Sequence, residues 1–292
     1  MRSFEDYHPL AQFLYFLAVS FLATFFIHPC LTVLSVLGAL SLYFVRNGDK
    51  NARSHVYYLL FFAVITLINP LFRHNGATVL FVLNHNPITL ESLLYGVFSS
   101  GMLLSVMYWF RSLSQMMSAD KLLYLFGKLS PRLALIVSMA LRYVPLFVRQ
   151  AKRVHTVQRT LGLYREENLI DNTRGAARTM SVMTTWALEN GIITADSMSA
   201  RGYGTTKRTI YHLFHMRRGD IALLCATVLL SATVLILAAF DCLEMSWYPY
   251  FTAPRTDAAA LICYIAYGLL ALLPTALEIG GRIRWKYLHS KI

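Results

Sequence analysis

Charged residues are scarce in this sequence. Asp, Glu, Lys and Arg make up 14% of its 292 residues, whereas hydrophobic residues make up 56%. A soluble globular protein carries roughly a quarter charged residues. This deficit argues against an ordinary soluble domain and predicts a protein whose surroundings are largely apolar.

Cysteine is also sparse, and its four occurrences stand singly, at Cys30, Cys225, Cys242 and Cys263. Because there is no CxxC pair or zinc-type spacing, no zinc or redox motif is indicated. We expect free thiols that pack as small hydrophobic residues. His212 and His215 are three positions apart, but carboxylate or cysteine support is absent. We therefore predict no metal site.

Motifs of nucleotide and hydrolytic chemistry are missing as well. The stretch "GYGTTKRT" at 202–209 has a superficial likeness to a phosphate-binding loop, but Thr206 stands where the Walker motif needs glycine. No GxSxG or HExxH sequence occurs. We expect this chain to hydrolyse no ATP and to bind no cofactor.

The sequence does contain long apolar runs. The length of each run is close to that of a helix that crosses the hydrocarbon core of a membrane, which is about 20 residues. These runs are 11–27, 30–45, 56–72, 89–110, 219–240 and 258–280. Their charged residues are Glu91, Asp220 and Glu278, all near the ends of runs, so no ion path is indicated. The start carries acidic Glu5 and Asp6, which argues against a removable signal peptide. The sequence predicts an all-α, polytopic helical membrane protein.

The distribution of basic residues predicts an orientation, because Lys and Arg in short loops favour the cytoplasm. Loop 46–55 and the tail after residue 280 are basic, whereas 73–88 and 241–257 contain one basic residue each. Six spans with both termini in the cytoplasm satisfy these biases. We therefore expect a multi-pass protein of the cell (plasma) membrane.

One internal segment, residues 111–218, carries most of the positive charge. It contains 17 of the 27 Lys and Arg residues and 6 of the 15 acidic residues, a net +11 of the chain's +12. We expect this segment to be cytoplasmic and to face the anionic lipid bilayer or an acidic protein partner. No zinc-finger or stacking-aromatic pattern indicates nucleic acid. The chain then divides into N-terminal membrane helices (1–112), long cytoplasmic helices (113–216) and C-terminal membrane helices with a basic tail (217–292).

Two helices are predicted in the cytoplasmic segment. The apolar run 133–148 is interrupted by Arg142 and Pro145, so we expect a buried or interfacial helix, bent at the proline, rather than a span. It continues with amphipathic spacing and ends at Gly162, a residue type common after helix C-termini.

The second helix is predicted over 174–201 and ends at Gly202, again a glycine. One stripe along it consists of small and flexible residues: Met180, Met183, Ala187, Gly191, Ala195 and Met198. Because glycine inside a helix is destabilising, Gly191 predicts another helix packed closely against it. An exposed Arg201 at the end of this helix is suited to bind a carboxylate on another protein. The alternative is an ordinary cation favoured by the helix dipole.

At this point the sequence resembles the transmembrane (T) component of energy-coupling factor (ECF) transporters, the family that includes the Q subunit of cobalt importers. The resemblance covers nearly the whole chain, and three segments carry it: "INPLFRHNGATVLFVLNHNPITLESLLYG" (68–96), "SADKLLYLFGKLSPRLALIVSMALRYVPLF" (118–147) and "SMSARGYGTTKRT" (197–209). The last of these is similar to the Ala-Arg-Gly signature of the family.

The resemblance implies a role for the two cytoplasmic helices. Members of the family couple two cytoplasmic ATPases, which bind ATP and magnesium, to a small substrate-binding S-type membrane subunit. Their coupling helices end in Ala-Arg-Gly-type motifs that sit in grooves on the ATPases. Ala200, Arg201 and Gly202 match the second motif.

The first motif falls at "VQRTLGL" (157–163), where the chain departs from the family pattern. Gln158 and Gly162 remain, but the arginine position holds Leu161 and the alanine position holds Thr160. Arg159 or Arg165 could substitute, or this end could bind mainly through apolar contact.

The expected function is therefore that of a non-catalytic coupling subunit in an importer of a vitamin or a transition metal such as cobalt. One alternative is a membrane-embedded interfacial enzyme, for which Asp196 with His155 or His212 is the best available pair. A second is a self-sufficient secondary transporter, which internal repeats and broken helices would reveal. The sequence shows neither.

Overall fold

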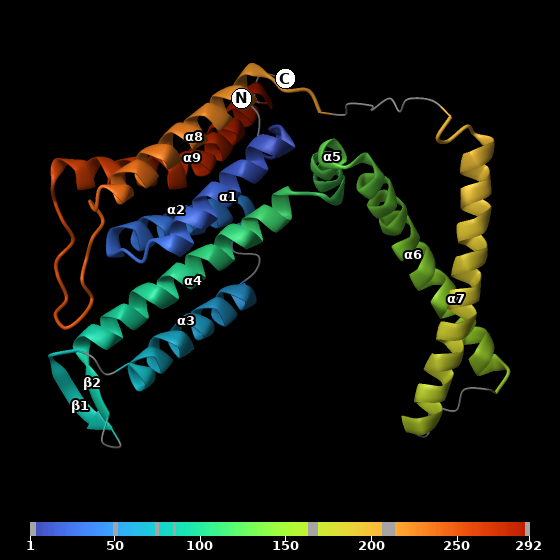
Figure 1. The fold of residues 1–292 in the computed structure, drawn as a ribbon, viewed down its shortest axis with the longest axis horizontal. Coiled ribbons are helices and arrows are strands. Elements are labelled where there is room, and N and C mark those ends of the chain that lie inside the picture. Colours follow the sequence, from blue (N-terminus) through green and yellow to red (C-terminus); the bar gives the residue numbers. More distant parts are fainter. Residues whose placement is uncertain are drawn as a thin grey trace. The chain divides into compact units, whose positions relative to one another are not determined.

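The computed structural model describes residues 4–48, 52–73, 76–83, 86–162, 169–205 and 214–289. The chain forms two compact units. Unit 1 contains residues 1–122 and 214–292, and unit 2 contains residues 123–213. Figure 1 shows the helices and strands of both units.

Unit 1 is a bundle of long helices with one short hairpin. Its elements are η1 (Phe4–Asp6), α1 (Pro9–Phe25), α2 (Pro29–Asn47), α3 (Ala52–Phe72), β1 (Val79–Leu83), β2 (Asn86–Thr89), α4 (Leu90–Met116), α8 (Arg218–Ala239) and α9 (Ala258–His289). In the bundle α1 and α2 lie between the α8–α9 pair and α4, while α3 packs on α4 (Figure 1). The prediction of an all-α membrane fold is confirmed.

Local sequence determines where several of these helices begin. Proline is the first residue of α1 and of α2, where its missing N–H leaves no helical hydrogen bond unmade. Thr89 precedes α4, and its Oγ1 accepts a hydrogen bond from the Ser92 N–H at 3.3 Å. Such a cap satisfies one of the backbone donors that a helix start leaves unpaired.

The centre of the bundle is a close crossing of α2 and α9. A Cβ placed on Gly38 would lie only 2.7 Å from the Cβ of Ala271, so the two backbones meet where both residues are small. One turn further, the hydroxyls of Ser41 and Thr275 are hydrogen-bonded at 3.0 Å. Tyr15 is fully buried nearby and donates its hydroxyl to the Leu270 carbonyl at 2.8 Å.

Among the described residues, six helices are long and apolar enough to cross a membrane, and they differ from the predicted set at two places. The predicted run 11–27 forms α1, which is shorter than the rest at 17 residues. The run 133–148, expected to be too short, is part of a 30-residue helix that meets the criterion. The remaining five predicted runs are candidates in the structure too.

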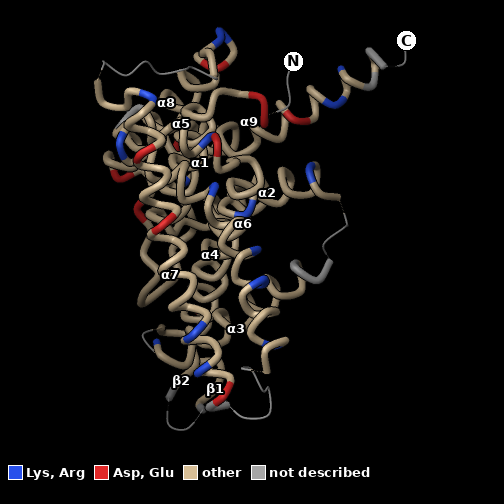
Figure 2. The backbone as a smooth tube through the Cα atoms, turned by 90° about the vertical axis from the view of Figure 1, so that its right-hand side faces the viewer, with Lys and Arg blue, Asp and Glu red and all other residues tan. Residues whose placement is uncertain are grey.

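Figure 2 colours Lys, Arg, Asp and Glu along the backbone, and in the long helices of unit 1 the sequence places these residues toward the helix ends. They are Arg46, Arg53, Glu91, Arg111, Arg218, Asp220, Glu278, Arg282, Arg284 and Lys286. α1 contains none. This segregation fits helices whose middle turns lie in hydrocarbon.

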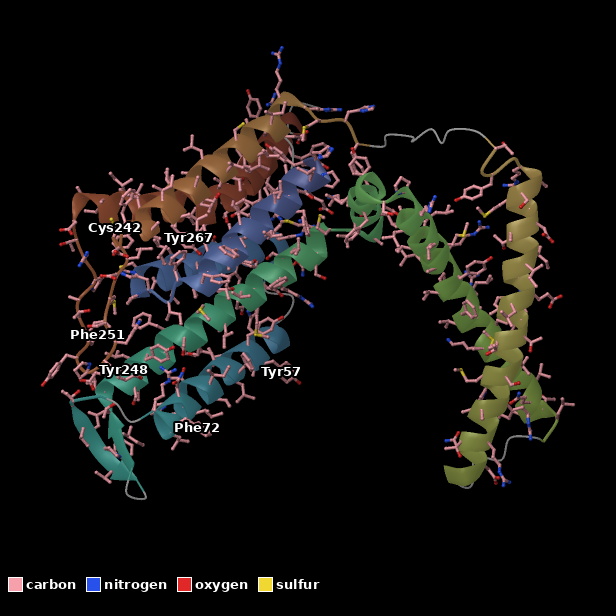
Figure 3. All side chains as sticks on the ribbon, in the orientation of Figure 1. Tyr57, Phe72, Cys242, Tyr248, Phe251 and Tyr267 are labelled. Atoms are coloured by element: carbon pink, nitrogen blue, oxygen red, sulfur yellow. The ribbon has the colours of Figure 1, made fainter. Side chains whose placement is uncertain are left out.

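The connection between α3 and α4 contains an antiparallel hairpin, which the sequence analysis did not predict. Glu91, in the first turn of α4, is 3% exposed and accepts the Thr78 hydroxyl at 2.7 Å, which holds the start of β1 against the helix. The loop from α8 to α9 covers the same end: Tyr248 and Phe251 lie beside the start of α4 (Figure 3), and Trp247 contacts the Tyr95 ring at 5.4 Å.

Unit 2 consists of the later part of α5 (Ala119–Leu129), together with α6 (Pro131–Thr160) and α7 (Leu169–Ala200). The first half of α6 exposes its apolar side chains, for example Leu133 (58%) and Ile136 (61%). Of the two expectations for this run, burial within the protein is therefore wrong, whereas an interfacial helix stays a prediction. An exposed apolar surface of this kind is suited to lipid or to a partner.

Candidate functional site

The paired helices α6 and α7 are the site that the sequence analysis singled out. They pack against each other, and contacts between described residues show how. The hydroxyls of Tyr143 and Thr194 are 2.6 Å apart, and the rings of Phe147 and Trp186 meet edge to face at 5.4 Å. Further along, the Thr179 hydroxyl donates to the Gln158 side-chain oxygen at 3.2 Å.

In these contacts residue numbers rise along α6 while they fall along α7, so the helices are antiparallel (Figure 1). Their C-terminal ends therefore lie at opposite ends of the pair. Thr179 lies level with Gln158 near the end of α6, and α7 runs 21 residues beyond Thr179, which at 1.5 Å per residue separates the two ends by about 30 Å.

The end of α6 follows the predicted pattern. The helix stops at Thr160, and Gly162 has a φ of +67°, a left-handed conformation that glycine adopts without steric cost. The Gly162 N–H donates to the Arg159 carbonyl at 3.0 Å. Gln158 is buried at 6% exposure by its contact with α7, so it fixes the last turn of α6 rather than facing a partner.

The end of α7 has the same backbone geometry. Gly202 has a φ of +77° and its N–H donates to the Ser199 carbonyl at 3.0 Å. The Tyr203 N–H donates to the Met198 carbonyl, also at 3.0 Å. These two bonds make up the Schellman motif, which satisfies carbonyls at a helix end.

The two ends superimpose in sequence register when their glycines are matched. Gln158–Gly162 then corresponds to Met198–Gly202, so Leu161 occupies the position of Arg201. Both side chains are exposed, Leu161 at 66%. Arg159 lies two residues earlier, about 200° around the helix axis from Leu161, and its substitution for the missing arginine stays a prediction. Arg165 falls outside the described residues.

The face of α7 that meets α6 coincides only partly with the predicted stripe. Direct contacts run through Thr179, Trp186 and Thr194, which are outside the stripe, whereas Met180, Met183 and Ala187 of the stripe line the groove beside them. Gly191 has nothing within 4 Å of a Cβ placed on it, so the prediction of a helix packed against it is wrong. Threonine hydroxyls and one indole make this contact face more polar than the periodicity of small residues suggested.

Beside this contact α6 and α7 enclose an open apolar groove of about 590 Å³, which sequence reasoning missed. Phe147 and Met183 line it, together with Met180 (69% exposed) and Leu188 (65% exposed). The feature of the sequence that could have indicated this groove was the pair of methionines three residues apart, Met180 and Met183, of which Met180 is exposed.

The residue pair considered for an enzyme is not assembled. Because Tyr143 lies level with Thr194 and Gln158 with Thr179, His155 and Asp196 are separated by about 20 Å along the helix pair. His212 falls outside the described residues. Within the described ranges, no group of three His, Cys, Asp or Glu side chains could hold a metal ion.

These features define a class of molecule: a multi-pass helical membrane protein with a separate pair of long antiparallel helices. The chain belongs to the cobalt transport protein family CbiQ, whose family model matches residues 1–212. The match includes both glycine-terminated helix ends.

Two curated relatives are also similar. One is the energy-coupling factor transporter transmembrane protein EcfT 1 of Listeria monocytogenes serotype 1/2a (strain 08-5578), 30% identical over 107 residues, which are 36% of this chain and 40% of the relative. The other is the EcfT protein of Lactobacillus helveticus (strain DPC 4571), 29% identical over 106 residues, which are 36% of this chain and 38% of the relative. The chain thus spans about two fifths of the length of these relatives.

Proposed function

We propose that this chain is the transmembrane coupling subunit of an ECF-type importer. It transmits ATP-driven motion from two cytoplasmic ATPases, docked at the ends of α6 and α7, to a substrate-binding S-type membrane subunit. The cargo is a vitamin or a transition-metal ion such as cobalt. ATP and magnesium bind to the ATPases, and this chain is non-catalytic and binds no cofactor of its own.

The observation that carries this proposal is the repeated helix end. Two ends with the same glycine geometry lie about 30 Å apart on one rigid antiparallel pair, a spacing that suits two separate proteins rather than one small ligand. Exposed Arg201 offers a guanidinium that can bind a carboxylate through two parallel hydrogen bonds. Leu161 offers an apolar contact at the corresponding place.

Charge supports the placement of these ends in the cytoplasm. Residues 111–218 carry net charge +11, and the tail after residue 280 is basic, as expected for segments on the inner side of the membrane. Both termini are then cytoplasmic. The membrane is the cell membrane.

The groove between α6 and α7 suits the S-type subunit. Its exposed methionine and leucine side chains have no polar requirement and can pack against an apolar helix of another membrane protein. The exposed apolar half of α6 continues this surface.

Co-purification tests the proposal directly. The tagged chain, extracted from native membranes in mild detergent, should carry two ATPase subunits and one small membrane subunit, identified by mass spectrometry. Arg201→Glu should lower the amount of bound ATPase by about tenfold or more, because a like charge facing an acidic groove is strongly unfavourable. Lys152→Glu makes the same charge change at an exposed site on α6, eight residues before its end at Thr160, and should leave binding intact. A chain that never associates with an ATPase contradicts the proposal.

A further inference from the structure

A polar cluster in unit 1 joins the two points where the chain passes between the units. The chain leaves unit 1 after Leu122 and returns to it at Phe214. Residues 4–8, just before α1, contact side chains close to both points. We call residues 4–8, Lys121 and Asp220 the junction.

Residues 4–8 are held firmly in the bundle. Phe4 is fully buried, and its ring meets those of Tyr15 at 5.6 Å and Phe16 at 6.0 Å. The Phe4 N–H donates to a carboxylate oxygen of Glu278 in α9 at 2.9 Å. The Gln12 side-chain amide donates to the Phe4 carbonyl. This segment is therefore attached to α1 and α9 by its own backbone.

Lys121 ties the departing chain to this segment. Its ammonium donates to the Glu5 carbonyl at 2.7 Å, the Met116 carbonyl at 3.0 Å and the Gln12 side-chain oxygen at 3.1 Å. The side chain is 9% exposed, and burial lowers the pKa of this ammonium from its usual value. All three donors of the ammonium thus meet acceptors, and Leu122, the last residue of the first segment of unit 1, follows directly.

Asp220 ties the returning chain to the same segment. One carboxylate oxygen accepts the His8 N–H at 3.0 Å, and the other accepts the Arg217 N–H at 2.8 Å. Asp220 is 3% exposed. Its carboxylate therefore fixes the start of α8, which lies four residues after the chain re-enters unit 1 at Phe214, to residue 8.

We propose that Lys121 is the positioning residue through which displacement of residues 123–213 reaches the membrane helices. Asp220 has the same role where the chain returns to unit 1, because it bonds the start of α8 to residue 8. This rests on the proposed function, since it assumes that ATPases move α6 and α7. Hydrogen bonds to buried charged groups are strong and directional, so a chain held by them transfers movement instead of absorbing it. The residues just before and just after segment 123–213 are thus both bonded to residues 4–8, and residues 4–8 are bonded to α1 and α9.

Hydrogen exchange measured by mass spectrometry on the purified complex tests this inference without knowledge of the cargo. The probe is a non-hydrolysable ATP analogue with magnesium. In the wild-type complex we expect the analogue to change exchange at the ends of α6 and α7 and also in α8 and α9, while residues 4–8 stay protected in both states. In Lys121→Met, which keeps a stem of similar length, exchange over residues 4–8 should rise about tenfold, as expected for loss of hydrogen bonds to a charged group. The analogue's effect should remain in α6 and α7 and disappear from α8 and α9.

Lys152→Met is the matched control, because it removes an exposed lysine from α6 and should behave like the wild type. Asp220→Asn, which weakens the return side, should give the same pattern as Lys121→Met. An analogue response in α8 and α9 that persists in Lys121→Met overturns the inference. The inference is also overturned if residues 4–8 of the wild type lose protection from exchange when the analogue binds. If the ends of α6 and α7 show no response in the wild type, the proposed function itself fails and the inference fails with it.

Discussion

Leu161 and Arg201 occupy the same position at the ends of two antiparallel helices, each directly before a glycine of positive φ. The backbone at the two places is alike, whereas the side chains differ in charge and hydrogen-bonding capacity. The two ends should therefore bind their partners through different physical forces, and this difference is measurable.

Salt should separate the two contacts. Ionic strength screens exposed charges but has little effect on apolar contact. The Leu161→Ala variant loses the apolar contact, so its remaining affinity for the ATPases should depend more strongly on salt than that of the wild type. The Arg201→Ala variant loses the ionic contact, so its remaining affinity should depend less on salt. Titration of ATPase binding to the detergent-solubilised chain from low to high salt measures both. Equal salt dependence of the two variants would contradict the assignment.

The glycines at the helix ends should not tolerate a side chain. Gly202→Ala places an L-residue at a φ of +77°, which costs about 1–2 kcal/mol, so the last turn of α7 should fray. Faster hydrogen exchange at Tyr203 would report this. Gly191→Ala is the matched control on the same helix: its Cβ meets open space, and it should stabilise α7 by up to about 1 kcal/mol.

The crossing of α2 and α9 predicts a strong effect of side-chain size. Gly38→Leu would force α2 away from Ala271, and we expect a loss of about 1–3 kcal/mol or more, seen as a lower thermal midpoint in detergent. At Gly268 a Cβ would meet Leu34 at 3.5 Å, an ordinary contact distance. Gly268→Ala should therefore leave the midpoint nearly unchanged, and similar losses in both variants would speak against a specific crossing.

His28 predicts a pH dependence of stability. It is 3% exposed, stacks on Tyr264 at 5.3 Å, and burial lowers its pKa from 6.5. The unfolded chain therefore binds the proton more readily than the folded chain, so this contribution is complete above about pH 6.5 and declines as the pH falls. His28→Phe keeps the ring and removes the titration. Its thermal midpoint should vary less with pH than that of the wild type between about pH 7.5 and 5.

The sequence predicted the helices better than their packing. Apolar runs of about 20 residues and glycines at Gly162 and Gly202 are local signals, and the structure confirms the helices they indicated. A helix continuing through Arg142 and Pro145 toward Gly162 was predicted, and α6 has this course; the run was judged too short and too charged for a span, whereas α6 is long and apolar enough to cross a membrane. The hairpin was missed because "VLFVL" is a short apolar run that periodicity alone does not assign to a strand.

The contacts of the candidate site depended on tertiary arrangement and were harder to predict. The departure at Leu161 was visible in the sequence, because the spacing from glycine fixed which residue takes the arginine position. The burial of Gln158 was not visible, since it results from Thr179 on another helix. Likewise, the junction uses backbone N–H groups as partners of Asp220 and Glu278, and such partners leave no mark on residue identity.

The antiparallel order of α6 and α7 has a consequence for symmetry. A half-turn about an axis perpendicular to the pair exchanges the two glycine-terminated ends, so their backbones follow an approximate dyad. Paired motor subunits related by their own dyad could meet equivalent backbones on both sides. Leu161 at one end and Arg201 at the other break this equivalence. If the two motor subunits are not identical, one should therefore prefer the leucine end and the other the arginine end.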